Sequence, residues 1–165
     1  MNAFEIDAFD FCRTNSSKEG VTPVAEMTRL SKECANNSGE ISWRVEGGSS
    51  KQGYPQMRLA VAGKVQLVCQ RCLAPFEYEI GSSTILLLGK DDADADEIEE
   101  IIDDESIDVI VGARSMNLMD LVEDEALLAV PQSPKHEKCP DTSLVDSAKS
   151  EKASPFAGLK GLKTN

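Results

Sequence analysis

Hydrophobic and polar residues alternate through the middle of the chain, between Glu40 and Gly89. Alternation with a period of two is typical of β-strands that are buried on one face. The runs that follow this pattern are residues 41–45, 57–67, 76–80 and, further along, 107–111. Residues 84–88 form a short apolar run, which predicts a strand covered on both faces. The pattern therefore predicts a sheet built from this part of the chain.

Glycine and aromatic positions add detail to these strands. The sequence GGSS at residues 47–50 predicts a flexible turn, and Gly63 permits a bend or a bulge within the next strand. Trp43 alternates with Ile41 and Val45 on one strand face. We therefore expect Trp43 to pack in the core and not to be available for stacking on a nucleic-acid base.

Residues 115–130, SMNLMDLVEDEALLAV, have the spacing of an amphipathic helix. Their apolar residues fall on one stripe, which should cover a face of the sheet, and Pro131 ends the helix. Glu125 lies near the apolar stripe, either as a boundary residue that reaches water or as the buried partner of an arginine. The opposite, polar face carries Asp120, Glu123 and Asp124.

A second helix is expected to begin at Thr22-Pro23, because threonine caps free amides and proline fits the first helical position. Val24, Met27, Leu30 and Cys34 would share one face of this helix, which makes Cys34 a core thiol, and residues 36–39 would end it. Residues 1–11 place Phe4, Ile6, Phe9 and Phe11 close together. They predict an N-terminal strand packed on the body, with a docking peptide for a partner as the alternative.

These elements predict an α+β fold in which an antiparallel sheet packs with two helices. A strongly twisted sheet could curl toward a barrel. The length of 165 residues fits one domain, which we place at residues 1–140. Residues 141–154 are polar, and we expect 141–165 to form a flexible linker and C-terminal tail.

The chain is strongly acidic, with 17 Lys and Arg against 29 Asp and Glu and a formal net charge of -12. Such a surface repels nucleic acid and anionic membranes on average, so basic partners are the first expectation. Residues 91–105 contain ten carboxylates and no Lys or Arg. They predict a solvated acidic loop or a frayed helix, with a binding site for a basic protein as the alternative. Their spacing lacks the glycine turn of a calcium loop.

The cysteine content and the hydropathy of the sequence indicate the cellular compartment of the protein. The five cysteines are an odd number at irregular spacing, and no apolar leader opens the chain. Both features favour a reducing cytosol without disulfides, so we expect a cytoplasmic protein. No apolar run approaches the roughly 18 residues that span a membrane.

The chemistry-bearing motif is Cys69-Gln70-Arg71-Cys72, at the end of a predicted strand. Such spacing serves half a zinc site or a redox pair. His136 and Cys139 supply a second pair of soft ligands, and the segment with Pro131 and Pro134 could return the chain to the first pair. Together they would form a Cys₃His site for structural zinc. The alternatives are a reduced cysteine pair that holds a turn and, with less support, a thiol redox site without the helix start that lowers a thiol pKa.

Several of these motifs occur in the order found in one bacterial family. The ordered set comprises GKVQLVCQRCLAPF at 63–76, the acidic stretch, DLVEDE at 120–125 running into Ala129-Val130-Pro131, and the terminal SPFAGLKGLK at 154–163. Over roughly residues 55–163 the sequence resembles the YceD family, named for large ribosomal RNA subunit accumulation; residues 1–54 match only loosely. The resemblance implies a part in making or stabilising large-subunit (23S) rRNA or its precursor, and no catalytic activity.

The residues themselves agree that catalysis is not predicted. The single histidine has no obvious Ser or Asp catalytic partner, and no phosphate-binding glycine loop or cofactor motif is present. Two functional classes remain. The first is a non-enzymatic ribosome-biogenesis factor that acts on 23S rRNA or on a large-subunit protein bound to it. The second is an acidic escort for a basic ribosomal protein or RNA-processing enzyme, with residues 91–108 as a polyanion.

Direct RNA contact would need a local basic patch, because the net charge opposes phosphate affinity. We expect such a patch on the sheet, with Tyr54 beside it, from Arg44, Arg58, Lys64 and Arg71. Contact with a protein partner would instead use exposed polar residues of the helix predicted at 115–130 and the amphipathic basic tail. These candidates are Asp120, Glu123, Asp124, Phe156, Leu159, Lys160, Leu162 and Lys163.

Overall fold

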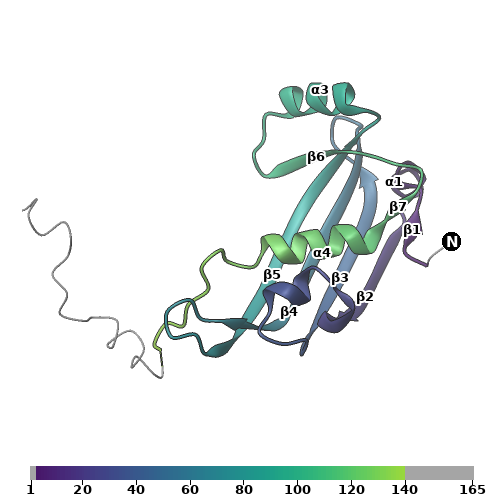
Figure 1. Ribbon diagram of the computed structural model, residues 1–165. Helices are drawn as coiled ribbons and strands as arrows, with labels where there is room; N and C mark the ends of the chain where they lie inside the picture. The colour runs from purple at the N-terminus through teal and green to yellow at the C-terminus, as the bar shows by residue number, and fades with distance from the viewer. Residues whose placement is uncertain (1–2, 140–165) are drawn as a thin grey trace, which may run out of the picture.

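The computed structural model describes residues 3–139, which contain a five-stranded sheet with helices on both faces (Figure 1). The strands of this sheet lie in the order β2-β3-β4-β5-β6. Their bounds are β2 Ser17–Pro23, β3 Glu40–Ser49, β4 Pro55–Val68, β5 Pro75–Gly89 and β6 Ile107–Val111. A separate antiparallel pair joins β1, Glu5–Ile6, to β7, Met116–Asn117.

The predicted α+β class is confirmed, and the sheet is mixed and open. Strands β2 to β5 are antiparallel neighbours, whereas β6 pairs parallel to β5. A parallel partner requires a crossover connection, and helix α3, Asp92–Ile102, supplies it. Because β2 and β6 are both edges, the sheet does not close into a barrel.

In the central strands, the apolar residues of the alternating sequence are buried and most of the residues between them are exposed. Ile41, Trp43 and Val45 of β3 are buried, as are the odd-numbered residues of β4 from Met57 to Leu67, apart from Gly63. Helix α4, Leu118–Leu128, lies across this face and contacts β3, β4 and β5 (Figure 1). Its N-terminus is capped by Asn117, whose side chain accepts a hydrogen bond from the Met119 amide. The helix predicted within 115–130 and its place on the sheet are thus confirmed, although Met116 and Asn117 belong to β7 and the helix is shorter at both ends.

The even-numbered residues of β3 and β4 form the opposite face of the sheet, which is left largely open. Helix α3 covers only the end of this face, where it contacts β5 and β6. Leu87, Ala95 and Ile98 are buried there, outside the main hydrophobic cluster. The acidic segment is therefore a helix, because Asp91 caps its N-terminus and two of its apolar residues pack on the sheet.

Other expectations about the first half of the chain were wrong. Thr22 and Pro23 end strand β2, and the helical residues that follow are two short pieces, a 3₁₀ turn at Val24–Glu26 and α2 at Leu30–Glu33. The N-terminal residues form β1 and helix α1, Ala8–Arg13, and not one strand. Gly47 and Gly48 pair within the β3–β4 ladder, so the turn lies after Ser49. Gly63 is paired without a bulge.

Helices in the described part of the chain reach 11 residues at most, and none is long and apolar enough to cross a membrane.

Candidate metal site and charged surfaces

The connection between β4 and β5 presents two cysteine sulfurs on one side of a tight turn. The Cys69 amide donates to the Ala74 carbonyl at 2.9 Å, and the Leu73 amide donates to the Cys69 carbonyl at 2.9 Å. The Arg71 amide points at Cys69 Sγ at 3.4 Å. Leu73 has a φ of 60°, in the left-handed region that closes such turns. Cys69 and Cys72 are both buried, so the turn is built around its sulfurs.

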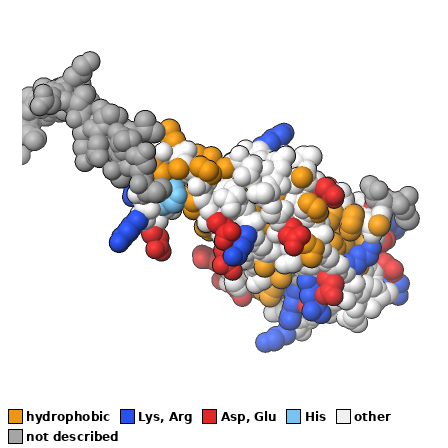
Figure 2. Space-filling model, turned by 90° about the horizontal axis from the view of Figure 1, so that it is seen from below, with side chains coloured by type: hydrophobic (Ala, Val, Ile, Leu, Met, Phe, Trp, Pro, Cys, Tyr) orange, Lys and Arg blue, Asp and Glu red, His pale blue; other side chains and the backbone are white. Residues whose placement is uncertain are grey.

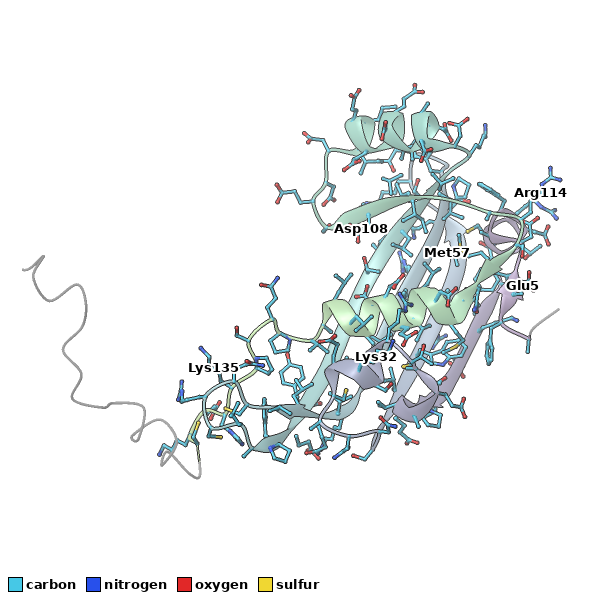
Figure 3. The ribbon with its side chains drawn as sticks, viewed as in Figure 1. Glu5, Lys32, Met57, Asp108, Arg114 and Lys135 are labelled. Carbon is cyan, nitrogen blue, oxygen red and sulfur yellow. The ribbon has the colours of Figure 1, made fainter. Side chains whose placement is uncertain are left out.

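The segment after α4 returns to this turn, as the two prolines predicted. The Gln70 amide donates to the Pro134 carbonyl at 2.8 Å, which joins the segment to the turn by its backbone. The His136 ring packs against Phe76, the second residue of β5, with ring centroids 4.7 Å apart. Figure 3 shows Lys135 of this segment beside the end of the hairpin. The same contacts bring His136 and Cys139 to the two buried cysteines.

The four predicted ligands converge on one point. Cys69 Sγ lies 3.8 Å from Cys139 Sγ, and Cys72 Sγ lies 3.4 Å from His136 Nδ1. One donor atom from each residue lies within 4.8 Å of all the others. Tetrahedral zinc with Zn–S of about 2.3 Å and Zn–N of about 2.0–2.1 Å separates its ligand atoms by about 3.6–3.8 Å. A disulfide would need about 2.0 Å, so the spacing fits metal ligation and not a bond between the sulfurs.

The electrostatics of the site favour a thiolate. Burial raises the pKa of the Cys69 thiol, but backbone amides of Cys72, His136 and Arg71 and the His136 ring outweigh it, so the pKa falls to about 5. Burial and the neighbouring sulfurs of Cys69 and Cys72 raise the pKa of Cys139. Several N–H donors aimed at one sulfur stabilise negative charge, and thiolate is the form that binds zinc. The cluster is therefore able to hold a divalent soft metal in a closed, four-ligand site.

The predicted basic residues do not form one patch. Arg44, Arg58 and Lys64 lie on the open face of the sheet, whereas Arg71 lies in the turn beyond the end of β4. Arg44 pairs with Glu46 at 2.9 Å and approaches Glu19 at 3.9 Å, and Lys64 pairs with Glu77 at 3.0 Å. Arg58 forms no ion pair with residues 3–139. Carboxylates therefore neutralise much of the positive charge on this face.

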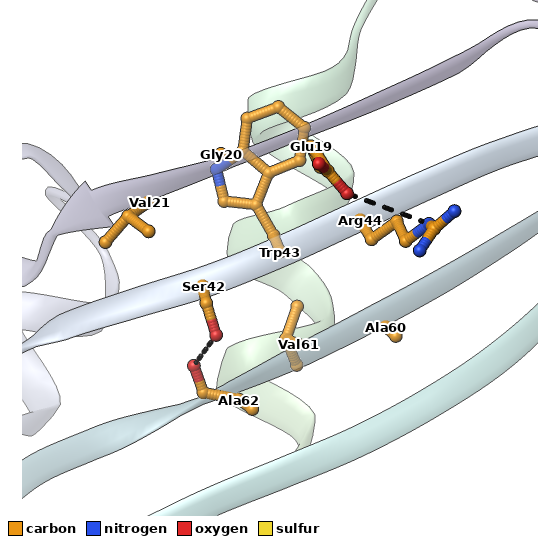
Figure 4. A pocket seen from close by; sticks show the side chains of 9 residues that line it. All are labelled: Glu19, Gly20, Val21, Ser42, Trp43, Arg44, Ala60, Val61 and Ala62. Atoms are coloured by element: carbon orange, nitrogen blue, oxygen red, sulfur yellow. Dashed lines mark hydrogen bonds and ion pairs between the residues drawn. The ribbon is translucent and has the colours of Figure 1, made fainter.

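Small side chains leave a shallow hollow in the open face, beside Arg44 (Figure 4). Ser42, Ala60 and Ala62 belong to its lining, and its volume is about 430 Å³. Trp43 contributes to the hollow only from the core side, since it is 5% exposed and its Nε1 donates to Thr22 Oγ1 at 3.0 Å. The burial expected for Trp43 is confirmed. Tyr54 follows the turn after β3, where it is half-buried.

Two of the three predicted acidic partner residues of α4, Glu123 and Asp124, bind Arg29 through their carboxylates, whereas Asp120 is exposed and contacts Arg29 only through its backbone carbonyl. Glu123 is buried, and its Oε1 accepts from the amides of Arg29 at 2.6 Å and Leu30 at 3.0 Å. Arg29 Nε also donates to Glu123 Oε2 at 3.2 Å, and its guanidinium pairs with Asp124 and bonds the Asp120 carbonyl. Glu123 therefore does not lie on a free polar face as predicted. Sequence could not pair it with Arg29, because 94 residues separate them.

Glu125 is buried as well, and its carboxylate accepts a hydrogen bond from the Ser82 hydroxyl and not from an arginine. Of the remaining predicted partner residues, all lie outside the described part of the chain. They are Phe156, Leu159, Lys160, Leu162 and Lys163.

Comparison with known families places these features in context. The model of one family, described as large ribosomal RNA subunit accumulation protein YceD, matches residues 57–163. The chain belongs to the YceD family. The matched residues include β4 from Met57 onward, strands β5 to β7, both long helices and all four candidate ligands. No curated protein and no solved structure matches the chain. The YceD name implies a role in the accumulation of large-subunit ribosomal RNA.

Proposed function

We propose that this protein is a non-enzymatic, zinc-stabilised ribosome-biogenesis factor that supports the synthesis, processing or stability of large-subunit 23S rRNA in the cytoplasm. The observation that carries this proposal is the family match over residues 57–163, which includes the whole Cys₃His cluster. The family description names an accumulation role and no reaction. The partner is the 23S rRNA or its precursor, reached directly or through a basic ribosomal or RNA-processing protein.

The zinc ion has a structural role in this proposal. Four protein ligands close the coordination sphere, which leaves no position for a substrate or an activated water. The ion would fasten the segment after α4 to the β4–β5 turn, where one backbone hydrogen bond, from Gln70 to Pro134, already joins them. A thiol redox role has less support, because Cys69 and Cys72 are both buried, whereas a reactive cysteine pair is partly exposed, and two further soft ligands converge on the same point.

The cellular test is depletion of the protein and measurement of the ratio of 23S to 16S rRNA. We expect the ratio to fall on depletion and to recover with the wild-type chain. Recovery should be incomplete with Cys72→Ser, which removes one buried ligand. Cys34→Ser is the matched control, since Cys34 is a free thiol outside the cluster. An unchanged ratio after depletion would contradict the proposed role.

The metal test uses purified protein and elemental analysis. We expect about one zinc per wild-type chain and per Cys34→Ser chain, and much less in Cys69→Ser or Cys139→Ser. Removal of zinc by a chelator should lower the melting temperature of the wild type. Wild-type protein that carries no metal after expression with zinc, and that does not bind added zinc, would refute the site.

The acidic escort stays as a second candidate because of helix α3. Six carboxylates lie within Asp92–Ile102, and none of them forms an ion pair with the described residues. The escort requires a basic protein partner that dissociates when α3 is neutralised. Asp96→Asn, Glu99→Gln and Glu100→Gln together would test it, because all three side chains are exposed and fold stability should be unaffected. Intact 23S levels in this variant would count against the escort.

A further inference from the structure

Three cations gather at the end of the molecule that carries the Cys₃His cluster. Arg71, Lys135 and Lys138 are exposed, and none of them pairs with a carboxylate of residues 3–139. Glu137 adjoins them in sequence, and Glu33 lines a hollow beside Gln70 and Pro134. On the open face of the sheet, Arg44 and Lys64 are paired with carboxylates, and Arg58 is the one of the three predicted cations there without an ion pair to the described residues. The tip of the β4–β5 hairpin thus carries three cations that form no ion pair with residues 3–139.

The cluster holds these three residues close together. Arg71 lies between Cys69 and Cys72, Lys135 precedes His136, and Lys138 precedes Cys139. Because the four donor atoms lie within 4.8 Å of one another, the backbone segments that carry the three cations lie close together. In Figure 2 the histidine lies at the narrow end of the molecule with blue and red side chains beside it, next to exposed hydrophobic surface.

An apolar side chain is displayed on the same turn. Leu73 is 63% exposed and has a φ of 60°. A leucine in the left-handed region costs roughly 1 kcal/mol, and exposure of its side chain gains nothing for folding. Asparagine or glycine would close the turn with less strain. The chain therefore presents an apolar contact at the tip at some expense to stability.

The acidic helix lies at the other end of the sheet. Strand β5 has 15 residues and runs from the cysteine turn to the start of α3, so its ends are roughly 45 Å apart at about 3.3 Å per residue. The Debye length is about 8 Å at physiological salt. The carboxylates of α3 are therefore screened from a ligand at the tip. A net charge of -12 does not prevent local attraction of a polyanion at this end.

We propose that the tip formed by Arg71, Leu73, Lys135 and Lys138 binds a single-stranded segment of large-subunit RNA. The three cations contact backbone phosphates, and Leu73 makes an apolar contact with an unstacked base. Single-stranded RNA offers both groups, whereas the bases of a duplex are stacked inside it. This inference rests on the proposed function and names the surface through which it would act.

The experiment measures binding of the zinc-loaded full chain to single-stranded fragments of 23S rRNA over a salt series. The tip variant carries Arg71→Gln, Lys135→Gln and Lys138→Gln. The matched control carries Arg44→Gln, Arg58→Gln and Lys64→Gln, which changes the net charge by the same amount on the open sheet face. Loss of three phosphate contacts should lower the slope of log affinity against log salt by about 2. If affinities converge at 1 M salt, the tip variant binds about 40-fold more weakly at 0.15 M.

Folding is checked for both variants by zinc content and melting temperature, and Lys135→Gln with Lys138→Gln serves as a second tip variant without a change inside the cysteine turn. Weaker binding by the tip variants alone supports the inference. Equal loss in both triple variants, loss in the control only, or no RNA binding by the wild type overturns it. The proposed function is judged separately, by the 23S to 16S ratio after depletion, so it can survive the loss of this inference.

Discussion

Glu123 should be one of the most sensitive side chains of the fold, because it accepts hydrogen bonds from two backbone amides of another element. The Leu30 amide belongs to a residue with no solvent exposure, and the Glu123 side chain is 10% exposed. Glu123→Ala would leave both amides without a partner. A buried donor left unsatisfied costs about 1–3 kcal/mol, so we expect the variant to lose about 3 kcal/mol of unfolding free energy. That is a large part of the roughly 5–15 kcal/mol of a typical domain.

The assay is urea unfolding of the zinc-loaded protein followed by far-ultraviolet circular dichroism. Two control variants separate the amide bonds from the ion pairs. Arg29→Ala removes the guanidinium but keeps both amide donors, and Asp124→Ala removes a carboxylate that is 52% exposed. The Arg29–Asp124 pair is 45% and 52% exposed and contributes about 0–1 kcal/mol, so we expect each control to lose less than Glu123→Ala, which alone leaves two amides without an acceptor. A loss in Arg29→Ala equal to that in Glu123→Ala would refute the reasoning.

Glu123 also gives a signed pH dependence. Burial raises the pKa of its carboxyl, but the amides of Leu30 and Arg29 and the Arg29 guanidinium outweigh burial and lower it below the ordinary value of 4.5. The Glu123 carboxylate therefore makes its full contribution to the free energy of unfolding above pH 4.5, and this contribution is lost as the pH falls through the folded-state pKa. Glu123→Gln keeps an acceptor but has no charge to lose. The stability gap between wild type and Glu123→Gln should narrow in acid, and a gap that widens would contradict the assignment.

Two further predictions concern packing. In Gly63→Ala the new Cβ would lie 2.2 Å from the Glu40 carbonyl oxygen, so we expect a loss of about 2 kcal/mol in urea unfolding, while Gly81→Ala on the opposite, open face meets no atom within 4 Å and should change stability by less than about 0.5 kcal/mol. Ile98→Ala should weaken the packing of α3 by about 3 kcal/mol and expose residues 90–106 to protease and hydrogen exchange. Zinc content should not change in that variant, and loss of zinc would mean that α3 is coupled to the hairpin tip.

Local pattern was enough to predict the strands around Trp43 and Leu59 and the helix before Pro131. Each of these elements is buried on one face, and its apolar residues recur at the spacing that places them on that face. The apolar positions in the sequence are therefore the buried positions in the structure. The convergence of Cys69 and Cys72 with His136 and Cys139 was also predictable, because few residue types serve as soft ligands. The distances between these four ligands are set by the path along which the chain returns to the turn after α4.

The misses came from contacts between distant residues. The Thr22-Pro23 pair has the local features of a helix start, but Gly20 and Thr22 belong to an edge strand that packs on the Trp43 ring. A Cβ on Gly20 would lie 2.9 Å from that ring, a constraint that no local pattern contains. Glu123 looked like a surface residue because Arg29 and Leu30 are remote in sequence. The Asp91 cap and the helical spacing of Ala95, Ile98 and Ile102 were local signals that could have identified α3 as a helix.

The single tryptophan of the chain has a practical consequence. Trp43 is enclosed between Thr22 and the edge-on ring of Phe4, and it belongs to β3, whereas the four ligands lie at the end of the β4–β5 hairpin. Its fluorescence emission therefore reports on the sheet core and not on the tip. Emission that stays blue-shifted while a chelator strips the metal would confine the loss of order to the hairpin end. A red shift at the same chelator concentration would mean that the metal holds the whole sheet together.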